Sequence, residues 1–287
     1  MRNLRSEATK NPGRGDIPRP FVYRPAMITS LQNDKVRAVR ALQAQRRVRQ
    51  RERRFVFEGT RLVEEAVRAG VPPDFVLYTA QVEADTRGNA LLASLRQMNV
   101  PCYAVNEAVM AACSDTQTPQ GVLAVLPIPT HPAPEHPTLT LILDRVRDPG
   151  NLGTILRTAL AAGVEQVLLT PGTVDASNSK VVRAAAGAHL HLRIVMLGWE
   201  AIAAAVAGSD VWLAEASGET PYTAVDWTRP VALCVGGEAT GAGEEARALV
   251  GGRVSIPMVA EVESLNTATA TAVILFEIVR QRGKNGE

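Results

Sequence analysis

Aromatic residues and cysteines are scarce in this chain, and long apolar runs are missing. Only 4% of its 287 residues are aromatic, so we expect a core of Ala, Val, Leu and Ile. The three cysteines, Cys102, Cys113 and Cys234, are odd in number and lack CxxC spacing, which argues against disulfides or zinc and favours a reducing, cytoplasmic location. The polar N-terminus lacks the apolar core of a secretory signal, and no apolar run approaches the roughly 20 residues of a membrane helix.

Metal ligands are also few. The chain has four histidines, of which His189 and His191 are spaced to share one face of a strand. We expect these two to be packing or surface residues, and the sequence therefore predicts no metal site.

The composition divides the chain into four parts. Residues 1–26 mix Arg, Pro and Gly without a period and are predicted to be a disordered tail. Residues 27–128 are predicted to form a small α/β domain. A run with five prolines in eleven residues follows, and we place a linker at residues 129–137. Residues 138–287 form the second domain.

Each predicted domain alternates strands with helices. In the first, we expect helices at 34–53, 60–69 and 89–98, and strands at 75–79, 102–105 and 121–126. In the second, near-continuous apolar strands at 139–143, 166–170, 211–214, 231–235 and 254–256 predict a parallel sheet covered on both faces. Helices are expected at 152–162, 180–186, 199–206 and 267–282.

Positive charge is concentrated in one segment of the first domain. Nine basic residues lie between Lys35 and Arg54, with almost no acidic residues among them. A surface of this kind attracts nucleic acid, and we expect Arg46, Arg47 and Arg49 to contact RNA. The alternative is a solvated helix face.

Three polar or glycine-rich segments follow predicted strands of the second domain, where open α/β sheets bind ligands. The first runs from Asp144 to Arg157, with Asn151 placed to cap a helix and Gly153 leaving room for a close approach. The second is the glycine loop after residue 235, which contains Glu238. The third leads to Ser264 and Asn266 at the start of a helix.

The sequence excludes two common kinds of nucleotide-binding site. Gly236 and Gly241 have the spacing of a phosphate-binding P-loop, but Ala242 and Gly243 stand where Lys and Ser or Thr are required. No GxGxxG joins the first strand and helix of either domain, so a dinucleotide site is not predicted either.

Taken in order, the strings DPGNLGTILRTA, GGEATG and SIPM…ESLNTATATAVILFE resemble the signature of SpoU-like (TrmH-like) RNA ribose methyltransferases of the SPOUT class. ITSLQNDKVRAVRAL and FVFEGTRLVEEAVRAG resemble the L30e-like RNA-binding domain that precedes the catalytic domain in ribosomal-RNA members. Gly237 and Ala242 depart from the usual family residues in the glycine loop.

The resemblance implies an α/β fold with a trefoil knot in the C-terminal parallel sheet, S-adenosylmethionine as methyl donor and a homodimer. Small residues after Thr267 would allow close dimer packing. By position, the donor would be held by Gly236, Ile256 and Leu265. The catalytic groups would be Asn151, Arg157, Glu238, Ser264 and Asn266.

The expected reaction is methyl transfer to a ribose 2′-hydroxyl of structured RNA, most of all 23S ribosomal RNA. Arg157 is the family's candidate for activating the hydroxyl, but arginine stays protonated, so we expect it to stabilise the developing alkoxide or hold a phosphate. Asn151 and Ser264 would hold the ribose, Glu238 would orient Arg157, and Asn266 would fix the loop. The alternatives are a transfer-RNA methyltransferase, a non-catalytic RNA-binding protein and a nucleotide-dependent enzyme.

Overall fold

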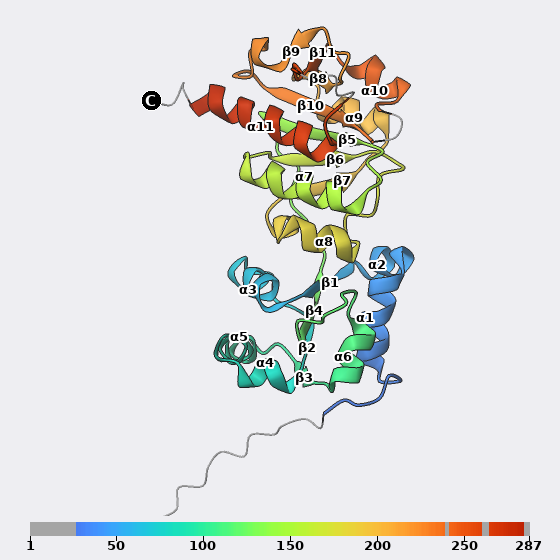
Figure 1. Cartoon of the computed structure of the whole chain (residues 1–287), viewed down its shortest axis with the longest axis vertical. Coiled ribbons are helices and arrows are strands. Elements are labelled where there is room, and N and C mark those ends of the chain that lie inside the picture. The colour runs from blue at the N-terminus through green and yellow to red at the C-terminus, as the bar shows by residue number, and fades with distance from the viewer. Residues whose placement is uncertain (1–26, 239–240, 260–263, 284–287) are drawn as a thin grey trace, which may run out of the picture.

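The computed structural model describes residues 27–238, 241–259 and 264–283, and the tail predicted at 1–26 lies outside them. Two sheets, one in each half of the chain, organise the molecule (Figure 1). This arrangement confirms the predicted α/β fold with a smaller N-terminal domain. None of the helices in the described ranges has both the length and the apolarity needed to cross a bilayer.

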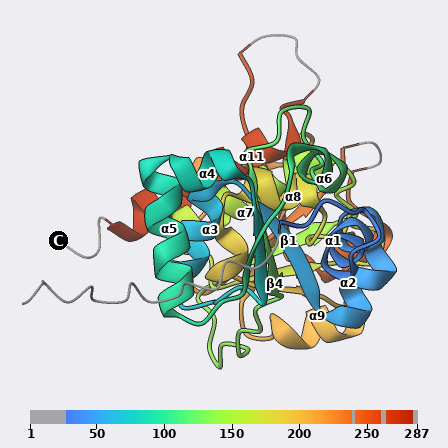
Figure 2. The same cartoon turned by 90° about the horizontal axis from the view of Figure 1, so that it is seen from below.

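The smaller sheet has helices on both faces (Figure 2). Its strand order is β1 (Arg54–Glu58), β4 (Val122–Pro127), β2 (Phe75–Tyr78) and β3 (Cys102–Ala104), with only β2 and β3 parallel. One face packs against α3 (Thr60–Arg68), α4 (Ala80–Ala84) and α5 (Thr86–Gln97). The other packs against α1 (Asp34–Ala44), α2 (Arg46–Glu52) and α6 (Glu107–Cys113).

The single helix predicted at 34–53 is wrong, because the basic segment forms two helices, α1 and α2. Gln45 between them is extended, with φ −121° and ψ 112°. The Arg49 guanidinium donates to the carbonyls of Leu42 and Gln43 at 2.7 and 3.0 Å. These bonds satisfy carbonyls at the end of α1 that a continuing helix would have used, so α2 can leave in a new direction.

The larger sheet has seven strands, and every pairing between them is parallel, as predicted. Its order is β7 (Arg193–Met196), β6 (Gln166–Leu169), β5 (Leu139–Asp144), β10 (Val231–Gly236), β8 (Asp210–Ala214), β11 (Gly252–Ser255) and β9 (Thr220–Pro221). One face packs against α7 (Pro149–Ala161), α8 (Ser179–Ala185) and α11 (Thr267–Gly283). The other packs against α9 (Trp199–Ala205) and α10 (Glu244–Leu249).

The start of α7 differs from the expected cap. Asp148 is the N-cap, and its side chain accepts a hydrogen bond from the Asn151 amide at 2.7 Å. Pro149 follows in the first helical turn, where proline has no amide to lose. Asn151 therefore lies inside the helix, and its side chain is available for contacts with other segments.

Candidate active site

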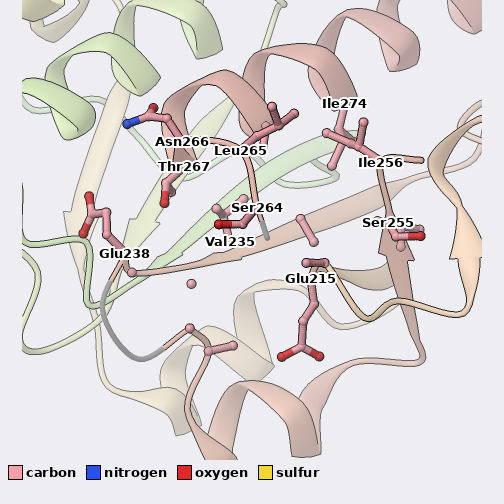
Figure 3. Close-up of a pocket in the computed structure, with 18 of the residues that line it drawn as sticks. Glu215, Val235, Glu238, Ser255, Ile256, Ser264, Leu265, Asn266, Thr267 and Ile274 are labelled. Atoms are coloured by element: carbon pink, nitrogen blue, oxygen red, sulfur yellow. The ribbon is translucent and has the colours of Figure 1, made fainter. Parts of the chain in front are cut away.

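A pocket of about 720 Å³ lies beyond the carboxyl ends of β8, β10 and β11, within the range of small-molecule sites. Segments 214–216, 235–238, 241–242, 254–258 and 264–274 contribute its lining. In Figure 3, Glu238 and Asn266 lie at one end of the pocket, and Ile256 and Ile274 lie at the other. The three residues predicted to hold the donor, Gly236, Ile256 and Leu265, all line it.

Glycine is required at the base of this pocket. A Cβ at Gly236 would lie 2.3 Å from the Ala242 nitrogen and 2.4 Å from the Gly241 carbonyl carbon. A Cβ at Gly237 would lie 2.3 Å from the Arg145 carbonyl oxygen. A larger residue at position 237, where this chain departs from the family, would therefore not fit here without a shift. The glycine cradle beside Ile256 and Leu265 fits a flat adenosine group held by backbone atoms.

Asp144, at the end of β5, fixes the far side of the glycine loop, and the sequence did not reveal this role. Asp144 is 1% exposed. One carboxylate oxygen accepts from the Gly243 amide at 2.7 Å, and the other accepts from Thr170 Oγ1 at 2.9 Å. The pairing of Asp144 with Gly236 brings Gly243 near, and the pairing of Leu143 with Leu169 brings Thr170 near.

Asn151 joins two of the three motif segments through its side-chain amide. Its Nδ2 donates to Glu238 Oε1 at 2.8 Å, and its Oδ1 accepts from Asn266 Nδ2 at 3.0 Å. The second Glu238 oxygen accepts from the Arg147 amide at 3.4 Å. Both carboxylate oxygens of Glu238 therefore accept from the first motif segment, and no hydrogen bond joins Glu238 to Arg157 among the described residues; the role of Glu238 in orienting Arg157 stays a prediction.

Asn266 also begins helix α11. Its Oδ1 accepts from the amides of Ala268 and Thr269 at 2.9 and 3.3 Å, as an N-cap does. The side chain therefore ties the first turn of α11 to Asn151. Ser264 precedes this cap and lines the pocket.

Arg157 lies outside the pocket lining, on an exposed position of α7. Gly153, one turn earlier, packs against α8, where an added Cβ would lie 2.7 Å from the Val181 carbonyl oxygen. Gly153 thus admits neighbouring backbone. Within the described ranges, Arg157 makes no hydrogen bond or ion pair that would hold its guanidinium away from a substrate.

One acidic residue of the pocket was also missed. Glu215 follows β8, lines the pocket and pairs with Arg247 at 2.6 Å. Arg253 lies 3.7 Å from the same carboxylate. A lone acid after a strand gives no sequence signal, because its partners are distant in the chain.

Cysteine chemistry is disfavoured. Burial raises the pKa of the Cys102 and Cys113 thiols to about 11 and that of Cys234 to about 12. All three therefore stay protonated near neutral pH and are poor nucleophiles. In the part of the chain that the structure describes, no group of His, Cys, Asp or Glu is arranged to hold a metal ion.

The structure separates the three arginines predicted to contact RNA. Arg46 and Arg47 on α2 are exposed. Arg49 is only 4% exposed and pairs with Asp175, with Nη2 at 2.7 Å and Nε at 2.8 Å from the same oxygen. Arg49 is therefore unavailable to RNA, because its guanidinium is buried in contacts within the chain.

Comparison with known proteins assigns this chain to a family. Residues 138–276 match the SpoU rRNA Methylase family, and residues 33–124 match the MRM3-like substrate binding domain. The 23S rRNA (guanosine(2553)-2′-O)-methyltransferase of Bacillus subtilis is 32% identical over 256 residues, which cover 88% of this chain and 98% of that protein. The 23S rRNA (uridine(2479)-2′-O)-methyltransferase of Streptomyces viridochromogenes is 30% identical, with 89% and 92% covered.

The same likeness holds in three dimensions. The AdoMet-bound rRNA methyltransferase of Sinorhizobium meliloti matches with a TM-score of 0.78 and 33% identity, over 89% of this chain and 97% of that one. The fold and the family are those of an RNA ribose methyltransferase that uses S-adenosylmethionine. The chain belongs to the SpoU rRNA methylase family. The predicted family, enzyme class and methyl donor are confirmed.

Proposed function

We propose that this enzyme methylates a ribose 2′-hydroxyl of 23S ribosomal RNA. The observation that carries this is the near-complete coverage of two relatives that act on 23S rRNA, with both domains matched. It favours ribosomal over transfer RNA. One of these relatives modifies a guanosine and the other a uridine, so overall likeness does not assign the base here.

S-adenosylmethionine would be held by Gly236, Ile256 and Leu265, whose glycine cradle and apolar side chains suit its adenosine group. When bound, it supplies an electrophilic methyl group on a sulfonium. The chain must then hold the ribose oxygen in line with that methyl group and stabilise the charge left when the hydroxyl loses its proton.

Five polar residues divide this work. Asn151, Glu238 and Asn266 form a connected chain that keeps the rim of the pocket in shape. Ser264 would contact the ribose from the pocket wall. Arg157 is exposed and permanently charged, so we assign it to the developing alkoxide or an adjacent phosphate rather than to proton abstraction.

We assign RNA selection to the smaller domain. Residues 27–128 would form this domain, 129–137 the linker and 138–287 the methyltransferase domain. The exposed Arg46 and Arg47 support an RNA surface on α2, because phosphate contacts supply much of the affinity for nucleic acid.

A homodimer is the proposed assembly. Phe276 on α11 is 50% exposed, and Val279 on α11 and Leu160 on α7 are each 37% exposed. Apolar side chains exposed on helices that pack together favour a protein partner. Ala268 is buried in the chain's own core and Ala270 lines the pocket, so the larger side chains would form the contact.

We further propose a cytoplasmic location and a trefoil knot in the C-terminal segment. The three free cysteines support the first, since they suit a reducing compartment. Segments 235–238, 241–242 and 264–274 line one pocket, and this closeness supports the second.

Mapping ribose methylation in ribosomal RNA from cells with and without this gene tests the proposal. We expect one 2′-O-methyl group to disappear and to return with the parent gene but not with Arg157→Ala. An unchanged methylation map would reject ribosomal RNA as the substrate, and full return with Arg157→Ala would remove Arg157 from the reaction.

A further inference from the structure

Helix α8 and the turn after it are shared between the two domains. They follow β6 of the larger sheet, yet Val182 and Leu190 are buried in the core of the smaller domain together with Phe55. His189 packs its ring 5.7 Å from that of Phe55. In Figure 1, α8 lies between the two sheets. The smaller domain is therefore docked on the larger one, in addition to being tethered by the proline-rich segment.

Two polar contacts hold this docking in one orientation. In the first, Arg49 reaches from α2 to Asp175 just before α8, in a pair that is 4% and 13% exposed. In the second, Asp115 of the smaller domain accepts from Ser179 Oγ at 2.6 Å and from both terminal nitrogens of Arg183 at 3.3 Å. A buried ion pair requires well-defined geometry to offset desolvation, so the first contact tolerates little rotation.

The docked helix is in turn fixed to the active site. At Gly153 an added Cβ would lie 2.4 Å from Ala184 Cβ, so α7 and α8 are in close contact. Helix α7 carries Asn151, which bonds Glu238 and Asn266 at the pocket. A continuous series of packed elements therefore connects α2 to the pocket rim.

Arg46 on α2 lies at the carboxyl ends of the strands of the larger sheet, as the pocket does. Arg46 Nη2 lies 3.7 Å from the sulfur of Met196, the last residue of β7. Met196 pairs with Leu169, which pairs with Leu143, the residue before Asp144. RNA that lies along the carboxyl ends of these strands can contact α2 and the pocket at the same time.

We propose that the Arg49–Asp175 and Asp115–Ser179–Arg183 contacts form a rigid spacer that sets the distance between the RNA surface on α2 and the methyl-transfer site, and so selects the nucleotide. This inference rests on the proposed function. Arg49 and Asp115 are positioning residues, since both act on RNA through the placement of α2.

Asp115→Ala is the first test, because Asp115 is partly exposed and its loss spares the core. We expect the KM for ribosomal RNA to rise about tenfold and methyl groups to appear at additional riboses, with donor affinity unchanged. Arg49→Lys, which keeps the charge but loses the planar fork, should act in the same direction. Pairing Asp115→Arg with Arg183→Asp should restore much of the single-site pattern.

Arg87→Ala is the matched control, since it removes an ion pair with Glu64 that lies wholly within the smaller domain. It should leave the KM and the methylation position unchanged. Methylation of the parent's single nucleotide with unchanged KM in both Asp115→Ala and Arg49→Lys would overturn the spacer. The parent enzyme, assayed alongside, reports separately on the proposed function.

Discussion

Asn151→Ala removes the side chain that joins the Glu238 loop to the start of α11, and we expect it to impair methyl transfer far more than folding. The helix itself should persist, because Asp148 and Pro149 define its first turn without the Asn151 side chain. The variant therefore isolates the two bonds at 2.8 and 3.0 Å that align the rim of the pocket.

The two hydrogen bonds of Asn151 are expected to affect stability little and the rate of methyl transfer strongly. Glu238 and Asn266 are exposed, so the two bonds together add only about 1 kcal/mol to the free energy of unfolding. For an in-line displacement, however, a misplacement of about 1 Å can reduce the rate about 100-fold. We thus expect kcat to fall about 100-fold, with a small change in thermal stability and in donor affinity.

Two further variants make the reasoning refutable. Asn151→Asp has nearly the same shape but replaces the donating amide with a carboxylate facing Glu238, so its rate should fall as far as that of Asn151→Ala. Glu238→Gln retains an accepting oxygen and should lose less. Single-turnover transfer of labelled methyl groups to ribosomal RNA measures all three. A parent-like rate for Asn151→Asp would show that the Asn151–Glu238 bond is not needed.

Three other perturbations probe separate parts of the molecule. Gly236→Ala forces a Cβ into the facing loop, and calorimetry should show at least about a 100-fold loss of donor affinity while circular dichroism stays parent-like. Changing Arg46 and Arg47 to Glu should weaken RNA binding and flatten its dependence on salt, without affecting donor affinity. An unchanged salt slope would show that these two arginines form a solvated surface that does not contact RNA. Burial lowers the pKa of His189 to about 4 from 6.5. Between pH 6.5 and about 4, the unfolded chain therefore binds one proton more than the folded chain. The free energy of unfolding should fall by about 1.4 kcal/mol per pH unit as the pH drops through this range. Urea titrations of His189→Gln should lack that component.

The sequence predicted best those elements whose burial is uniform. The central strands β5, β6 and β10 are buried almost throughout and mostly apolar, so their positions were evident. Strands β7 and β9 lie at the sheet edges, where half-burial leaves no continuous apolar run, and both were missed. Strand β1 was missed for another reason, because it directly follows the arginine-rich segment, whose predicted helix ends at residue 53 and leaves no turn to mark the start of a strand.

The candidate site shows the same division. The glycine loop could be placed at the pocket because it follows β10 directly, and the Ser264–Asn266 segment because its string resembles the third motif of the family. Asp144 and Glu215 could not, since their importance comes from partners brought near by sheet register. The capping error at Asn151 arose because Asp148, also a good cap, stands three residues earlier.

Arg49 illustrates why a run of like charges does not define a single function. Its neighbours Arg46 and Arg47 face solvent, whereas its own partner Asp175 lies 126 residues away in the chain. Salt separates the two roles, because added ions screen exposed charges much more than buried pairs. Raising ionic strength should therefore weaken RNA binding through α2 while leaving the Arg49–Asp175 contact, and hence the methylated position, unchanged. A methylation position that drifts as salt rises would mean that exposed charges on α2, rather than the docked helix α8, determine the register of the RNA.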